Sequence, residues 1–229
     1  MSETTATIQI SQNGPYIVSG GLPLCKVSIA VNAEGESVSW QQGKEYPLQE
    51  SYALCRCGHS QNKPFCDGHH VKVSFDGTET ASRQSYVQQA KVFQGPTRYL
   101  TDATSLCSSA RFCDPHGTVW KSVGISGQAE AGEHFVAQVG LCPSGRLGAW
   151  DKETGQPIEP QYPVSIAVVE DPSQHCAGPL WVRGGVTIIA GDGFAYEIRN
   201  RVTLCRCGAS KNKPFCDGTH ISIGFQDEK

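Results

Sequence analysis

Short runs of alternating apolar and polar residues, broken by glycine and proline, extend over most of this chain. Residues 14–24 read GPYIVSGGLPL, and residues 178–188 read GPLWVRGGVTI. Each run predicts two short strands joined by a tight Gly-Gly turn. The Gly-Gly pair could instead hold a phosphate, but neither a G-x-G-x-x-G pattern nor a Walker lysine accompanies it, so we favour the turn.

The similarity between the two halves continues beyond these turns. Residues 46–48 (YPL) and 196–198 (YEI) lie 150 positions apart, and we predict a third strand there in each half. Apolar residues then alternate with polar ones at Val71, Val73 and Phe75, and again at Ile221, Ile223 and Phe225. A period of two predicts one more strand with one buried face in each half. The best helix candidate is Ala81–Phe93, although its apolar stripe is weak.

The composition supports a loop-rich β protein. The 229 residues include 25 glycines and 13 prolines, and 38% of them are hydrophobic. We therefore predict a mainly β fold with short helices (α+β), in which two β-rich units flank a different middle segment. Polar, Gly/Pro-marked connections suggest units at 1–95, 96–160 and 161–229.

Charge and cysteine content limit the partners and the compartment. The net charge is −3 and no basic run occurs, so we expect no nucleic-acid partner. No stretch approaches the roughly 20 apolar residues that span a bilayer, and the polar N-terminus does not read as a secretory signal. Eleven cysteines without such a signal predict a reducing, cytoplasmic setting in which thiolates bind metal.

A sixteen-residue pattern with metal-ligand spacing occurs twice. Residues 55–70 read CRCGHSQNKPFCDGHH, and residues 205–220 read CRCGASKNKPFCDGTH. Both contain three cysteines and a histidine in the order C-x-C-x8-C-x3-H. The candidate ligands are Cys55, Cys57, Cys66 and His70 in the first copy, and Cys205, Cys207, Cys216 and His220 in the second.

The spacing of these residues suggests how they bind metal. Cys66 and His70 are four apart, which predicts one face of a helix that starts near Pro64 and Asp67. The C-x-C pair is closer than in common zinc knuckles and could place both thiolates on one iron. Small and polar residues near the candidate ligands would let hydrogen-bond donors approach the sulfides of a cluster. These residues are Ser60, Asp67 and Gly68 in the first copy, and Ser210, Asp217 and Gly218 in the second. A structural Cys3His zinc site is the alternative.

Both copies resemble the CDGSH-type, mitoNEET-like iron–sulfur family, whose pattern is C-x-C-x2-[S/T]-x3-P-x-C-D-G-[S/A/T]-H. The resemblance implies two [2Fe–2S] clusters, each with three cysteine ligands and one histidine, and makes structural zinc a remote alternative. His69 departs from the pattern and is a possible competing ligand. Family members are usually homodimers whose exchanged strands form a β-cap. Two copies in one chain therefore imply an intramolecular pseudo-dimer and a monomer in solution.

The middle segment has cysteines of its own. Cys107 and Cys113 form a C-x5-C pair and Cys142 opens a C-P-S-G stretch, which resembles the divergent monocluster ferredoxins. The resemblance implies a small ferredoxin-like domain with a third cluster, [3Fe–4S] or [4Fe–4S]. A fourth ligand could be Cys176, Asp114 or His116. The alternative is a small domain with ordinary buried thiols.

Together these features predict a multi-cluster iron–sulfur protein that transfers electrons to a redox partner protein. The alternative is iron–sulfur cluster transfer to an apo iron–sulfur acceptor, or redox or iron sensing. No motif for catalysis was found, so we do not expect an enzyme. Because a histidine ligand carries no negative charge, its cluster should have a higher reduction potential than an all-cysteine cluster.

Overall fold

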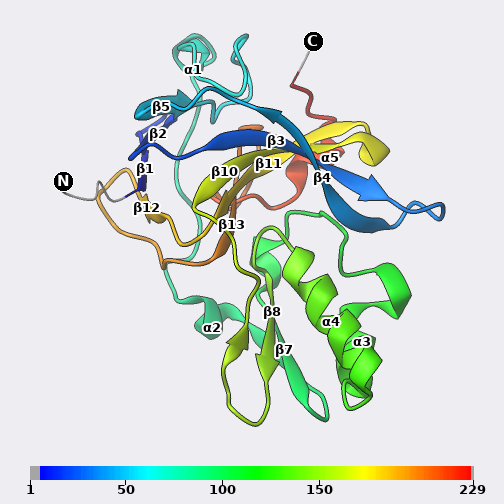
Figure 1. Ribbon diagram of the computed structural model, residues 1–229. Coiled ribbons are helices and arrows are strands. Elements are labelled where there is room, and N and C mark those ends of the chain that lie inside the picture. Colours follow the sequence, from blue (N-terminus) through cyan, green and yellow to red (C-terminus); the bar gives the residue numbers. More distant parts are fainter. Residues whose placement is uncertain (1–5, 228–229) are drawn as a thin grey trace.

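The computed structural model describes residues 6–227, which form three β-sheets and short helices (Figure 1). The strands are β1 (Thr7–Ile10), β2 (Tyr16–Ser19), β3 (Leu24–Val31), β4 (Ser37–Glu45), β5 (Ser51–Leu54), β6 (Lys91–Gln94), β7 (Arg98–Asp102), β8 (Leu147–Asp151), β9 (Pro157–Ile158), β10 (Ser165–Asp171), β11 (Cys176–Arg183), β12 (Thr187–Ile189) and β13 (Arg201–Leu204). The α-helices are α1 (His69–Lys72), α2 (Tyr86–Gln89), α3 (Val119–Ser122), α4 (Ala129–Leu141) and α5 (Thr219–Ser222), and the 3-10 helices are η1 (Thr104–Leu106), η2 (Pro115–Gly117), η3 (Val123–Ile125) and η4 (Pro172–Gln174). The predicted mainly β fold is confirmed.

The two halves of the chain exchange strands. The first sheet has the order β12-β1-β2-β5, and the second has the order β13-β11-β10-β3-β4. In each sheet, antiparallel strands from one half of the chain pair with one parallel strand from the other half. Ile8 of β1 lies opposite Ile188 of β12, and Ile166 of β10 lies opposite Leu24 of β3. The two sheets are therefore related as two strand-exchanged copies of one unit.

One apolar core joins the halves. Alternate residues of β1, β2, β10 and β11 point into it, and Ile8, Leu54, Ile166 and Leu204 are among its fully buried members. At roughly 25 cal/mol per Å² of apolar area removed from water, this burial is the main force that holds the exchanged strands together. The opposite face of β10 and β11 carries Val169 and Trp181, which pack against Phe112 of the middle segment.

The middle segment has its own sheet and core. Its strands have the order β6-β7-β8-β9, and α3 and α4 pack on them around Leu100, Phe135 and Leu147. Figure 1 shows this green segment on one side of the molecule, below β10, β11 and β13 and away from α1. The middle segment therefore covers the sheet that leads to the second repeated loop. Within residues 6–227, no helix has the length and apolar character that a membrane crossing requires.

Three of the predictions are wrong. The alternating residues after each final histidine belong to α1 and α5 and the turns after them, because Gly68 and Gly218 adopt a left-handed conformation that starts a helical turn. Of the predicted helix Ala81–Phe93, only α2 is helical, since Ala90 is extended and β6 begins at Lys91. The third strand of each half is β5 or β13, a few residues after the predicted position.

Candidate metal centres

Each repeated loop folds back on the strand that precedes it. The amide of Cys55 donates to Pro64 O at 2.8 Å, and the amide of Cys66 donates to Ala53 O at 2.8 Å. In the second loop the corresponding bonds join Cys205 to Pro214 (2.8 Å) and Cys216 to Thr203 (2.9 Å). Backbone pairing thus brings the third cysteine of each pattern beside the first.

The donor atoms lie in pairs at distances that suit shared metal ions. The two sulfur atoms of the C-x-C pairs are 3.8 Å apart for Cys55 and Cys57, and 3.7 Å for Cys205 and Cys207. Two thiolates bound at about 2.3 Å to one tetrahedral metal lie about 3.8 Å apart. Cys66 Sγ is 3.4 Å from His70 Nδ1, and Cys216 Sγ is 3.3 Å from His220 Nδ1. These four pairs fit two metal ions per loop. Among residues 6–227, no group of three or more His, Cys, Asp or Glu side chains has the arrangement that would hold a single metal ion.

The cysteine and histidine of each loop are not on a common helix, contrary to the prediction. Helix α1 starts after Gly68, whose φ is 85°, and α5 starts after Gly218, whose φ is 84°. Cys66 and Cys216 precede these helices. The left-handed glycine turns the chain sharply, and this turn returns the histidine to the cysteine.

The serine and the aspartate of the repeated pattern hold the backbone of each loop in shape. Ser60 Oγ donates to Phe65 O at 2.6 Å and accepts from the Asn62 amide at 3.0 Å, so its proton is not available to a cluster. Asp67 accepts from the amides of Gln61 and His69 at 2.8 and 3.1 Å. Ser210 and Asp217 make the equivalent bonds in the second loop.

His69 is engaged away from the candidate ligands. Its Nδ1 lies 2.9 Å from Asp67 Oδ2, within hydrogen-bond distance of that carboxylate. His70, at the spacing of the repeated pattern, is the histidine whose ring nitrogen lies beside Cys66. The geometry therefore favours His70 over His69 as the donor in the first loop.

The protein environment prepares one thiolate in each C-x-C pair. A hydrogen bond from Cys57, aided by backbone amides, lowers the pKa of Cys55 to about 6, and the same arrangement with Cys207 lowers the pKa of Cys205 to about 7. The hydrogen-bonded partner thiols, Cys57 and Cys207, have raised pKa values. Burial lowers the pKa of His220 to about 4 and keeps its imidazole neutral, the form that binds metal.

Two buried arginines lie between the ligands and were missed in the sequence. Arg56 and Arg206 occupy the central position of each C-x-C pair and are both 2% exposed. Arg56 donates to the carbonyl groups of Ser11 and Gly77, whereas Arg206 also pairs with Glu170 and Asp227. Within residues 6–227 no carboxylate forms an ion pair with Arg56. The signal was available, because Arg is the charged residue between the first two cysteines in both copies.

The two loops meet at their second cysteines. Cys57 and Cys207 form an antiparallel backbone bridge. A groove of about 800 Å³ opens beside this bridge, and its walls include Cys57, Phe75, Cys207 and Phe225. The two candidate centres are therefore neighbours that share one open surface.

The structure also gathers the three cysteines of the middle segment. Cys107, Cys113 and Cys142 line one small cavity together with Arg146 and Ser144. Burial raises the pKa of Cys113 to about 12, and the adjacent Asp114 and Cys142 add to the shift. Such a thiol needs a bound cation before it ionises at neutral pH.

The candidates for a fourth ligand differ in position. Asp114 does not line the cavity, but its Oδ1 lies 3.5 Å from Sγ of Cys113, which does. Cys176 is buried in β11 and is not part of the cavity wall. The side chain of His116 is outside the described part of the structure. Asp114 is therefore the candidate whose position fits best.

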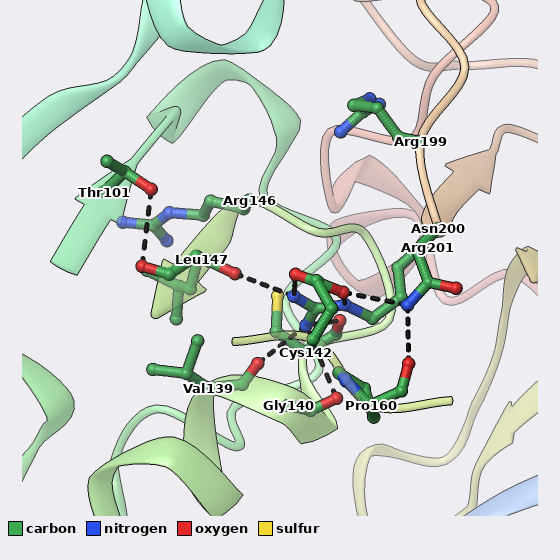
Figure 2. Close-up of polar contacts among 12 residues, drawn as sticks. Thr101, Val139, Gly140, Cys142, Arg146, Leu147, Pro160, Arg199, Asn200 and Arg201 are labelled. Carbon is green, nitrogen blue, oxygen red and sulfur yellow. Dashed lines mark hydrogen bonds and ion pairs between the residues drawn. The ribbon is translucent and has the colours of Figure 1, made fainter. Parts of the chain in front are cut away.

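Arg201 joins the middle centre to the strand that leads to the second loop. Figure 2 shows its guanidinium group among the carbonyl groups of Val139, Cys142 and Leu147, to which it donates at 2.7, 2.9 and 3.1 Å. It also pairs with Glu159. Three residues further along β13, Leu204 ends the strand and Cys205 follows.

Comparison with known protein families supports iron binding by the two repeated loops. The model of the iron-binding zinc finger family of CDGSH type matches residues 13–71 and 177–221. No curated protein and no solved structure gives a significant match to the chain. The middle cysteines lie outside both matched regions, whereas the eight candidate ligands of the repeated loops lie within them. The two ends of this chain therefore match the iron-binding CDGSH family, one repeated loop in each.

Proposed function

We propose that this protein carries electrons on two [2Fe–2S] clusters, one in each repeated loop. The pairing of the donor atoms supports this most directly, since the spacing for two metal ions occurs in both loops. Cys55 and Cys57 would hold one iron and Cys66 and His70 the other, with the equivalent residues in the second loop. When bound, such a cluster accepts and returns one electron.

The surrounding residues suit a centre with negative charge. Three thiolates around two irons and two sulfides leave net negative charge, which increases on reduction. Buried Arg56 supplies positive charge within the first ligand loop, whereas Glu170 and Asp227 pair with Arg206 in the second, and a histidine ligand adds no negative charge in either loop. Both features raise the reduction potential above that of an all-cysteine centre in the same setting.

We further propose a third iron–sulfur cluster on Cys107, Cys113 and Cys142. Their convergence on one cavity supports this proposal. Three thiolates suit a [3Fe–4S] cluster, and a [4Fe–4S] cluster would take a fourth ligand, for which Asp114 is placed best. The third centre would let the protein relay electrons to a redox partner protein.

Iron and acid-labile sulfide per chain, with EPR of protein purified without oxygen, test these proposals. We expect about four irons if only the repeated loops bind clusters, and about seven or eight if the middle centre is filled too. An oxidised [3Fe–4S] centre is paramagnetic, whereas an oxidised [2Fe–2S] centre gives no EPR signal. Zinc without sulfide would refute the proposal.

A second candidate function is transfer of a [2Fe–2S] cluster to an apo iron–sulfur acceptor. The partial exposure of Cys66 and His70 favours it, because a ligand histidine near solvent can be reached and protonated. Mixing loaded protein with an apo ferredoxin would distinguish the two functions. Loss of one cluster to the acceptor supports transfer, and reduction without loss supports electron transport.

A further inference from the structure

The two repeated loops are nearly identical in sequence but differ in their cover. Cys216 and His220 are 2% and 3% exposed, whereas Cys66 and His70 are only partly buried. Phe215 is buried and its counterpart Phe65 is not. Since the loops share their local geometry, the difference comes from what packs on them.

The cover of the second loop is the segment 105–111 of the middle domain. A β-carbon on Gly218 would overlap Oγ of Ser109 and lie 3.7 Å from Cys107 O. Asn212 Nδ2 donates to Ser105 O at 2.8 Å. In the first loop, a β-carbon on Gly68 would have no neighbour within 4 Å. We name residues 105–111 the cover segment.

An ion pair with the buried carboxylate of Asp171 holds the cover segment in place. Arg111 donates two bonds to Asp171, at 2.7 and 3.1 Å, and Asp171 is 2% exposed at the end of β10. Ser109 and Arg111 have φ angles of 58° and 62°, a conformation that non-glycine residues adopt at a cost of about 1 kcal/mol or more. Next to it, Phe112 packs against Trp40 with ring centroids 4.8 Å apart.

We propose that the cover segment closes the second site, so that the first site is where this protein exchanges iron or electrons with other molecules. This inference depends on the proposed function only in that both loops hold metal. A molecule that reaches Cys216 and His220 of the second site must first displace Ser109 and break the Arg111–Asp171 pair, whereas Cys207 lines the open groove beside Cys57. A molecule that reaches the first site meets Cys66 and His70 at the surface.

Iron release to a strong water-soluble chelator at pH 7 tests the inference on the loaded full-length chain. Cys66→Ser disables the first site and reports release from the second, and Cys216→Ser does the reverse. Iron held in the middle centre is common to both variants and cancels in the comparison. We expect release from the second site to be about tenfold slower or more, because it requires local opening. Equal rates would overturn the inference.

Two matched glycines provide the control. Gly68 and Gly218 have φ angles of 85° and 84°, so alanine imposes the same backbone cost at both. Gly218→Ala should displace Ser109 and speed release from the second site, and adding Ser109→Gly should restore the slow rate. Gly68→Ala should leave release from the second site unchanged. Acceleration that Ser109→Gly fails to reverse would contradict the role of the cover segment.

A variant outside both loops keeps the test decisive if Gly218→Ala does not fold. Arg111→Gln loses the ion pair with Asp171 and should also speed release from the second site alone. Absence of iron and sulfide from the purified chain would refute the proposed function. Two loaded sites with equal release rates would refute this inference and leave the proposed function standing.

Discussion

The carbonyl oxygen of Cys207 lies 2.6 Å from the position that a β-carbon on Gly58 would occupy. Cys57 O has the same relation to Gly208, at 2.5 Å. These reciprocal contacts are possible only with glycine, because any side chain would meet the backbone of the opposite loop. The two metal loops are therefore packed against each other at their second cysteines.

Gly58→Ala should separate the loops. The substitution adds a clash with the backbone of Cys207 to the cost of a left-handed alanine, so we expect a loss of about 3 kcal/mol or more in unfolding free energy. Gly68→Ala, with a similar φ angle and free space, should cost about 1 kcal/mol. Urea unfolding of both variants measures the difference, and equal losses would contradict the close packing.

Arg56→Gln should lower the reduction potential of the first centre. The variant removes a buried positive charge that forms no ion pair with a carboxylate of residues 6–227, and the reduced cluster loses that stabilisation. Arg56→Lys keeps the charge and should retain most of the potential. A redox titration followed by EPR gives both midpoints. An unchanged midpoint in Arg56→Gln would show that the arginine acts only in packing.

His70→Cys should lower the potential of the first centre and make it more resistant to acid. A thiolate adds negative charge where an imidazole ligand adds none, and it replaces a basic ring nitrogen that acid can protonate. His220→Cys should act in the same way at the second centre. Redox titration and the loss of visible absorbance between pH 7 and about 5 check the prediction. If neither property changes, histidine is not the ligand.

His220 should make stability depend on pH. Its folded-state pKa of about 4 is below the ordinary 6.5, so the unfolded chain binds this proton first. The stabilising contribution of neutral His220 is complete above about pH 6.5 and is lost as pH falls toward about 4. In the metal-free chain we expect a loss of at most about 3 kcal/mol across this window.

Urea unfolding of the metal-free chain at several pH values measures this dependence. His220→Gln should flatten the profile between about pH 6.5 and 4. His70→Gln, in the less buried loop, is the matched control. A profile that His220→Gln leaves unchanged would contradict the assignment.

Arg201→Met should loosen the middle segment from the second half. The carbonyl groups of Val139, Cys142 and Leu147 would lose the guanidinium donor, and Glu159 would lose its ion-pair partner. We expect a loss of about 3 to 5 kcal/mol in unfolding free energy. Arg199→Met removes one bond, to Ser144 O, and should cost about 1 kcal/mol. Similar losses for both variants would contradict the central role of Arg201.

The local chemistry of the site could be predicted from the sequence because the ligands lie within sixteen residues. The mainly β fold and the Gly-Gly turns followed from short-range patterns in the same way, although the strands that flank each turn lie in different sheets and form no hairpin. The segments after His70 and His220 were misassigned because their period of two suits a strand, whereas left-handed Gly68 and Gly218 impose a helical turn. Backbone conformation outweighed the hydrophobic pattern there.

The difference in burial between the two loops could not be predicted from the sequence. Residues 55–70 and 205–220 are almost the same, and Gly218 of the second loop lies against Ser109, more than a hundred positions away. Which half receives the middle segment depends on the apolar face around Trp181 and on the Arg111–Asp171 pair. Such long-range packing cannot be inferred from local patterns.

The exchange of β3 and β12 determines when the protein can mature. The sheet that ends at Cys55 needs β12, and the sheet that ends at Cys205 needs β3 and β13. Both loops also need each other, through Gly58 and Gly208. A growing polypeptide therefore completes neither centre until the second repeated loop has left the ribosome. Metal insertion must follow that step, and a chain that stops after residue 160 loses the first centre together with the second.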